Sequence, residues 1–179
     1  MGLDMYLEKR IYIGANYEHR NIKGTIDIKQ DKKKIKINFD KISEITEQAG
    51  YWRKANAIHN WFVQNVQEGN DNCADYYVSQ KQLKELKDLC EKVIKSLKKS
   101  KTKTIKVESG WANGKKTFIN EKVFLDTTLA DKLLPTQEGF FFGSTDCNKW
   151  YLEELENTVE ILDEAIKDET SSFYYSSSW

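Results

Sequence analysis

The sequence has few residues that interrupt secondary structure, form disulfides or bind metals: one proline, three cysteines and two histidines among 179 residues. Cys73, Cys90 and Cys147 are widely spaced and form no C-x-x-C pair, which favours reduced thiols in a cytoplasm over a disulfide framework. The two histidines lie 40 residues apart and offer no structural zinc spacing. We therefore expect a cytoplasmic protein without a metal site.

Long apolar runs and common cofactor motifs are also missing. No stretch approaches the roughly 20 apolar residues that span a bilayer. Apolar and polar residues already alternate within residues 1–8, which leaves no room for the continuous apolar core of a signal sequence. Glycine-rich phosphate loops and the G-x-S-x-G nucleophile motif are absent. The acidic loop at residues 71–75 lacks the glycine and glutamate of an EF-hand. The sequence thus predicts no cofactor and no membrane association.

Charge is balanced overall but unevenly distributed. Basic and acidic residues both number 28, which argues against whole-molecule attraction to nucleic acid. Residues 81–106 nevertheless carry ten lysines against three acids, and residues 153–169 carry eight acids against one lysine. We expect these two segments to lie side by side, although either could instead contact a partner or a second subunit.

Alternating apolar and polar residues predict several strands. The first covers residues 3–13. A hairpin joins 25–28 to 35–39 through a lysine-rich tip at 29–34, and a second joins 104–111 to 115–124 through Asn113-Gly114. The apolar run 140–142 indicates a short buried strand, and the aromatic segment 172–179 is expected to pair as a strand or pack into the core.

Helical periodicity predicts three main helices. A short helix at 41–49 precedes the first, which covers 52–67. Ser79 to Gln82 forms a capping box that starts the second, with a stripe from Leu83 to Leu97. The third follows a cap at 144–146, with Trp150 at the start of its apolar stripe. The expected fold is one α+β domain over residues 1–179, an antiparallel sheet with hairpins covered by about three main helices.

The predicted helix at 52–67 concentrates chemically capable side chains. His59 lies at the edge of its apolar face, where a histidine can transfer protons, pair with Cys73 or Cys147, or simply complete a buried hydrogen-bond network. Arg53, Asn56 and Asn60 could bind phosphate, carboxylate or a nucleobase edge, or could tie the helix to neighbouring loops. Trp61 is expected opposite the apolar face, so either a second layer covers it or it is a contact surface.

Four segments carry a resemblance to a known family: the opening Met1–Leu7, Tyr51–Phe62, Leu133–Asp146 and Phe173–Trp179. In these segments the chain resembles a family of small proteins of tailed bacteriophages and prophages, nearly end to end. The family carries no established activity, so the resemblance implies a phage protein in a bacterial host cell and transfers no catalytic residues.

Three functional hypotheses follow. The favoured one is a non-enzymatic accessory protein that binds a host protein or sequesters a nucleotide-like signal, and so inhibits antiviral defence. Its candidate contact residues are Trp52, Arg53, Asn56, His59, Asn60 and Trp61. The alternative is a small enzyme acting on a nucleotide or phosphorylated metabolite, with His59 as acid and base; it requires His59 to face a solvent-reachable pocket. The third, a DNA-associated accessory protein, is the weakest, and a homo-oligomer is possible.

Overall fold

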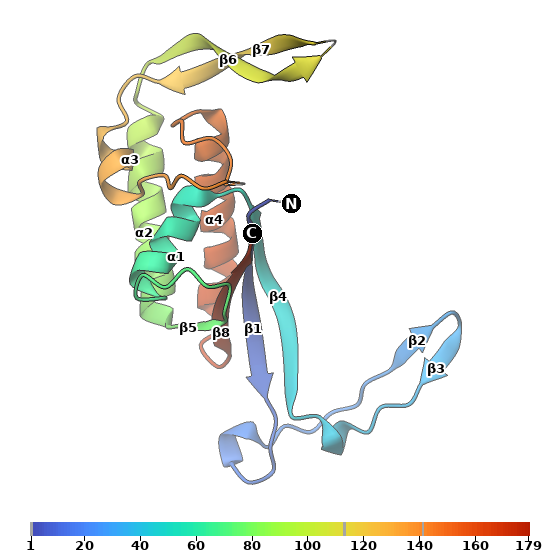
Figure 1. The fold of residues 1–179 in the computed structure, drawn as a ribbon. Helices are drawn as coiled ribbons and strands as arrows, with labels where there is room; N and C mark the ends of the chain where they lie inside the picture. The colour runs from blue at the N-terminus through green and yellow to red at the C-terminus, as the bar shows by residue number, and fades with distance from the viewer. Residues whose placement is uncertain (1, 113, 141) are drawn as a thin grey trace.

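A four-stranded antiparallel sheet forms the centre of the molecule (Figure 1). We describe it from a computed structural model that covers residues 2–112, 114–140 and 142–179. The strand order is β4 (Glu44–Arg53), β1 (Asp4–Tyr12), β8 (Ser172–Ser178) and β5 (Tyr76–Val78). β8 pairs with β1 on one side and β5 on the other, which confirms the strand expected at the carboxyl-terminal segment.

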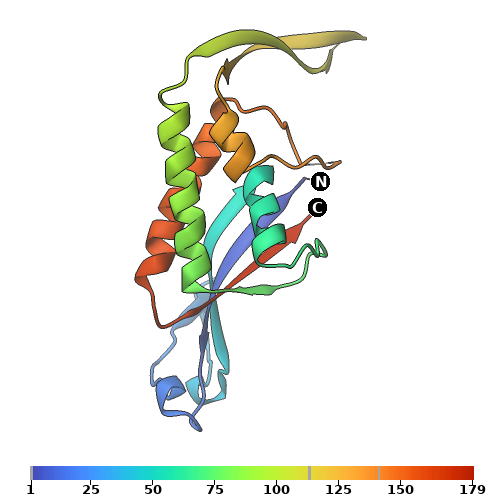
Figure 2. The ribbon, with the colours of Figure 1, turned by 90° about the vertical axis from the view of Figure 1, so that its left-hand side faces the viewer.

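One face of this sheet is buried, and its inward residues follow the period of two that strands impose. Leu3, Met5 and Leu7 point inward from the β1 segment, and Phe173 and Tyr175 lie beside them on β8. The helices cover this face, as the view from the side shows (Figure 2). The fold is therefore α+β, as the sequence pattern predicts.

β4 corrects two helix predictions. Residues 41–49 are not helical: a 3-10 turn at Phe39–Lys41 leads into β4, which runs to Arg53. The helix expected from residue 52 begins only at Asn56, as α1 (Asn56–Asn65). Pairing of β4 with β1 along its whole length outweighs the helix propensity of the Glu, Gln and Ala residues in this segment.

Three further helices complete the layer. α2 (Gln80–Leu97) starts at the predicted capping box, with Ser79 and Gln82 bonded reciprocally. α4 (Lys149–Lys167) lies beside it, and the two oppositely charged helices form the ion pairs Lys87–Asp163 at 3.2 Å and Lys98–Glu156 at 2.6 Å. The short α3 (Thr128–Leu133) was not expected from the sequence.

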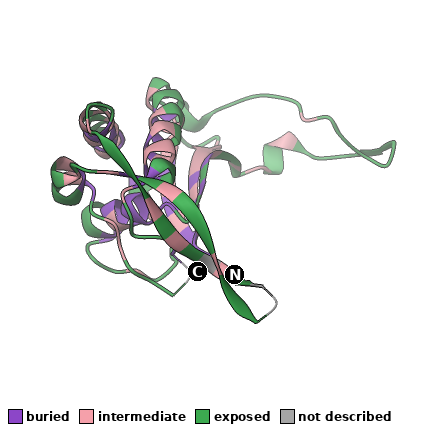
Figure 3. Cartoon of the chain, turned by 90° about the horizontal axis from the view of Figure 1, so that it is seen from above, coloured by how far each residue is buried: buried purple, intermediate pink, exposed green. Residues whose placement is uncertain are grey.

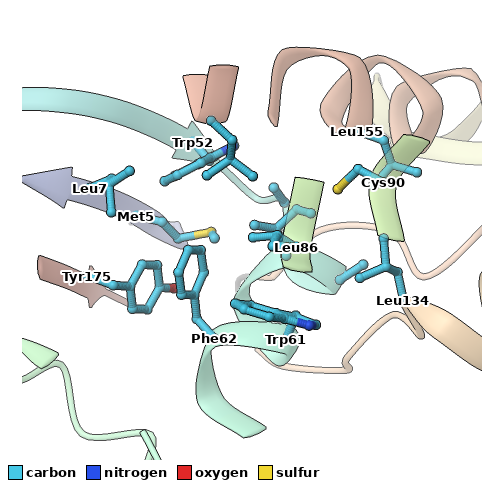
Figure 4. Packing of buried hydrophobic residues seen from close by; sticks show 14 of the residues in the cluster. Met5, Leu7, Trp52, Trp61, Phe62, Leu86, Cys90, Leu134, Leu155 and Tyr175 are labelled. Carbon is cyan, nitrogen blue, oxygen red and sulfur yellow. The ribbon is translucent and has the colours of Figure 1, made fainter. Parts of the chain in front are cut away.

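The core is rich in aromatic side chains, as Figure 4 shows. The rings of Phe62 and Tyr175 stack with centroids 3.9 Å apart, which joins α1 to β8. Cys90 and Leu86 enter the same cluster from α2, and Leu155 enters it from α4. Cys73 and Cys147 are free, as is the buried Cys90.

Two β-ribbons project from this body (Figures 1 and 3). The first pairs β2 (Ile28–Gln30) with β3 (Lys33–Ile35); its turn is Asp31-Lys32, so the strands begin and end closer to the tip than predicted. A 3-10 turn at Glu18–Arg20 lies between β1 and this ribbon. The second ribbon pairs β6 (Thr102–Ala112) with β7 (Lys115–Phe124), as predicted, although Asn113 lies outside the described residues.

The segment before α4 also differs from expectation. Phe140 is 91% exposed and Phe142 is buried, but neither belongs to a strand, and Phe141 lies outside the described residues. The cap of α4 is Asn148, whose side chain accepts from the Tyr151 amide, rather than residues 144–146. Trp150 lies outside the buried face of α4, which includes Tyr151 and Leu155, and is 67% exposed.

Candidate ligand cavity at the start of α1

The six contact residues predicted from the sequence fall into different environments. Trp52, His59 and Trp61 are buried in the core, so a second layer does cover Trp61. Asn60 is half-buried and donates to the Pro135 carbonyl at 3.1 Å, which ties α1 to the segment before α4. Only Arg53 and Asn56 lie together at a cavity.

His59 belongs to a buried hydrogen-bond network. Its Nε2 lies 3.0 Å from the Asp71 carboxylate and its Nδ1 lies 2.7 Å from the Tyr175 hydroxyl. Because a carboxylate only accepts, Nε2 carries the proton and donates, and Nδ1 accepts from Tyr175. Asp71 also accepts from the indole of Trp179 at 3.0 Å. The network therefore joins α1 to the end of β8.

This environment does not suit proton transfer to a ligand. His59 is fully buried, and burial lowers its pKa, with Asp71 opposing that effect. Both ring nitrogens are engaged by residues other than the cysteines. The thiol of Cys147 lies elsewhere, and burial together with Asp131 and Asp146 raises its pKa to about 12. His59 also does not line the cavity described next.

The cavity forms where β4 passes into α1. Lys54 adopts a left-handed conformation with φ of 61°, and its amide donates to the Leu3 carbonyl at 2.8 Å. This turn places Arg53 at the end of the sheet and Lys54 immediately before the helix. Ala55 occupies the N-cap position and supplies no side-chain cap. The first turn of α1 thus keeps amide donors that have no intrahelical acceptor.

The cavity has a volume of about 360 Å³, which is near the lower end of the range for small-molecule sites. Its floor includes Ala57 and Ile58 of α1 and Tyr151 and Leu155 of α4. Ala57 and Ile58 belong to the uncapped first turn, so the positive end of the α1 dipole lies at the cavity.

The loop before α4 forms one wall, and Asn56 holds it in place. The Asn56 side-chain amide donates to the Phe142 carbonyl at 3.2 Å and to the Ser144 carbonyl at 2.8 Å. Gly143 between them has φ of 92°, and a Cβ there would lie 3.2 Å from the Lys54 Cβ. Glycine therefore permits the close approach that shapes this wall.

Asp146 of the same loop, Glu121 of β7, and residues of α4 and its cap supply further polar groups. Asn148 is buried and donates to the Glu121 carboxylate at 2.8 Å, which fixes that acid at the rim. Burial raises the pKa of Glu154, with the neighbouring Glu153 adding to the effect. The indole of Trp150 is largely exposed at the mouth. The cavity lining therefore combines cations with carboxylates and an aromatic ring.

Comparison with known proteins found no matching family model, no matching curated protein and no matching solved structure.

The sequence predicts Arg53 and Asn56 of the cavity and not its other polar residues. Trp150 was predicted to begin the apolar stripe, but it lies five residues before Leu155, about 140° away around the helix, and so falls outside the buried face. Glu121 and Glu154 carry no local signal, because they reach the cavity through tertiary contacts only. Lys54 is adjacent to Arg53, but its left-handed backbone is not apparent from the sequence.

The described residues offer neither grouped metal ligands nor a helix suited to crossing a membrane. No group of three or more His, Cys, Asp or Glu side chains there is arranged to hold a metal ion. None of the helices in that part of the chain is long and apolar enough to cross a membrane.

Proposed function

We propose that the chain is a binding protein for a small nucleotide-like molecule, which occupies the cavity at the start of α1 without being chemically changed. The observation that carries the proposal is the convergence of Arg53, Lys54 and the uncapped α1 amino terminus on one cavity. Helix amino termini with flanking cations are suited to phosphate groups.

Other residues of the cavity lining suit a base. Trp150 presents an exposed indole at the mouth, and aromatic stacking of a nucleobase contributes about 1–3 kcal/mol in other proteins. Glu121 and Glu154 can accept hydrogen bonds from exocyclic amino groups, as carboxylates do when they bind cytosine. The volume of about 360 Å³ favours a mononucleotide over a larger ligand.

Sequestration is favoured over catalysis. The acid and base role considered for His59 requires a solvent-reachable imidazole, whereas this side chain is fully buried. Within a phage setting, which rests on the resemblance described above, the ligand would be a host signal and its removal would inhibit antiviral defence. Binding to a host protein is not supported by any particular contact of the cavity residues.

Isothermal titration calorimetry with AMP, GMP and 3′,5′-cyclic AMP tests the proposal on the full chain. We expect at least one of these mononucleotides to bind with one-to-one stoichiometry. Arg53→Gln and Lys54→Asn should each weaken binding about tenfold, the loss of one charge-assisted hydrogen bond. Asparagine is chosen at position 54 because it tolerates the left-handed conformation.

Trp150→Ala should also weaken binding. Its matched control is Trp111→Ala, which removes an indole of similar exposure on β6 and should leave binding unchanged. The control for the cation variants is Lys92→Gln, which removes an exposed cation on α2 away from the cavity and should likewise leave binding unchanged. If no mononucleotide binds at millimolar concentration, or if Trp150→Ala and Trp111→Ala have equal effects, the proposal is wrong.

A further inference from the structure

The neutral chain separates its charge between the body and the two ribbons. Residues 101–124, which form the β6–β7 ribbon, contain six basic and two acidic residues, a net charge of +4. Residues 13–43, which include the β2–β3 ribbon, contain eight basic and four acidic residues, again +4. The remaining residues carry 14 basic and 22 acidic side chains, a net charge of −8. Both projecting ribbons are thus basic extensions of an acidic body.

The strand register assigns the side chains of the β6–β7 ribbon to two faces. Lys106 pairs with Asn120, Thr104 with Lys122, Glu108 with Phe118, and Trp111 with Lys116, so these residues share one face. Glu121 and Val123 lie on the other face, where Asn148 binds Glu121 and holds the ribbon to the body. We name the first face the lysine–aromatic face; besides Lys106, Trp111, Lys116, Phe118 and Lys122 it carries Glu108, Thr104 and Asn120.

The lysines of this ribbon are largely uncompensated. All six are exposed, and Lys116 is the only one that forms an ion pair within the described part of the chain, with Glu108 at 2.6 Å. Two lysines lie over rings of the same face, Lys106 over Phe118 and Lys116 over Trp111, each 5.9 Å from the ring centroid. Trp111 and Phe118 are themselves 68% and 51% exposed. Cations and aromatic rings therefore lie together on one solvent-facing surface.

We propose that the lysine–aromatic face of the β6–β7 ribbon is a binding surface for duplex DNA. An isolated two-stranded ribbon fits the major groove of B-form DNA, which is about 12 Å wide. The 11 residues of β6, at about 3.4 Å per residue, span roughly one turn of the duplex. Lys106, Lys116 and Lys122 would contact phosphates along that length, and Asn120 and Thr104 offer hydrogen-bonding groups between them.

The charge distribution favours this occupant over a protein or a single strand. Phosphate is repelled by the acidic body and attracted by the ribbon, so a polyanion is guided to the projecting element. A duplex RNA is disfavoured because its major groove is deep and narrow. On a single strand, successive bases need a row of stacking rings. The two rings of this face, Phe118 and Trp111, occupy adjacent pairs, and the pairs Thr104–Lys122 and Lys106–Asn120 carry none. The zero net charge of the whole chain argues against general attraction to nucleic acid, but it does not exclude binding through this local basic surface.

Fluorescence anisotropy of a labelled 20-bp DNA duplex with the full chain tests the inference at several salt concentrations. We expect a dissociation constant of roughly micromolar order at 50 mM NaCl that rises steeply with salt. The double variant Lys106→Gln/Lys122→Gln should weaken binding at least tenfold and reduce the slope of log affinity against log salt by about two, since each phosphate contact contributes about 0.9.

The control removes equal charge elsewhere. Lys84→Gln/Lys92→Gln on α2 replaces two exposed lysines that form no ion pair among the described residues, and it should leave the salt slope unchanged. Trp111→Ala/Phe118→Ala should weaken binding without altering the slope, because no phosphate contact is lost. Circular dichroism confirms that each variant is folded.

Three results would overturn the inference: no duplex binding at 50 mM NaCl, equal losses in the ribbon and α2 variants, or tighter binding of the single strand or of an RNA duplex. The cavity variants Arg53→Gln and Lys54→Asn lie at a different site and should bind DNA like the parent. The two proposals can therefore fail independently.

Discussion

The buried contact between Trp52 and Thr158 provides the sharpest test of how β4 is placed. The Trp52 indole donates to the Thr158 hydroxyl at 2.9 Å, and that hydroxyl donates in turn to the Glu154 carbonyl at 2.6 Å. Trp52 is 1% exposed and Thr158 is fully buried. Thr158→Val keeps the shape of the side chain and removes the acceptor, so the indole N–H is left buried without a partner.

The magnitude follows from that orphaned donor. Leaving one buried donor unsatisfied costs about 1–3 kcal/mol, and the Glu154 carbonyl loses only a hydroxyl donor, since a helical carbonyl also accepts from its backbone partner. We expect the free energy of unfolding of Thr158→Val to fall by about 2 kcal/mol. Trp52→Phe also destabilises the fold, through lost burial and a small cavity. In the Trp52→Phe background, Thr158→Val should cost much less, because no indole remains to be orphaned.

Urea unfolding followed by far-ultraviolet circular dichroism measures the four variants of this cycle without depending on tryptophan fluorescence. The coupling energy between the two positions should be about 1–2 kcal/mol, with an unchanged dependence on urea concentration. An additive cycle, in which Thr158→Val costs the same with and without the indole, would refute the contact and with it the inward orientation of Trp52 on β4.

Three other substitutions probe the core and its titration. The free energy of unfolding should fall as the pH drops below 6.5 towards the lower folded-state pKa of His59, because the unfolded chain binds the proton more readily; His59→Gln should flatten this part of the pH profile in urea titrations at pH 7.5 and 5.5. Gln67 is fully buried and its amide has no partner among the described residues, so Gln67→Met should raise the unfolding free energy by about 1 kcal/mol or more, and an unchanged or lower urea midpoint would contradict this. Gly50→Ala should destabilise by about 1–3 kcal/mol, because the new methyl would lie 2.5 Å from the branched Ile161 side chain; a parent-like melting temperature would count against that packing.

The elements that the sequence predicts correctly are those whose signal is local. The capping box at Ser79 starts α2 whatever surrounds it, and alternation marks β1 and β6–β7 without reference to other elements. β8 was expected to be ordered because its aromatic residues need burial, and Phe173 and Tyr175 are indeed buried.

The failures lie where distant segments decide the outcome. Residues 44–53 have helix-forming composition, but β1 offers them a full ladder, and Trp52 finds its partner on a helix more than 100 residues away. The cavity could not be predicted for the same reason: Trp150 and Glu154 line one cavity with Arg53 only after α4 has packed beside the sheet. Arg53 and Asn56 were identified from chemistry alone, whereas their separation onto a strand and a helix required the tertiary structure.

The position of β8 bears on how the chain folds as it is synthesised. This strand joins β1 to β5, so the sheet remains in two pieces until residues 172–178 have left the ribosome. Before then Phe62 and His59 lack Tyr175, their stacking and hydrogen-bonding partner. Pairing of β1 with β8 therefore closes a long loop and has to wait until β8 has been synthesised, and such distant pairing slows folding. A nascent chain stalled before β8 would display an open, aromatic core to chaperones and proteases.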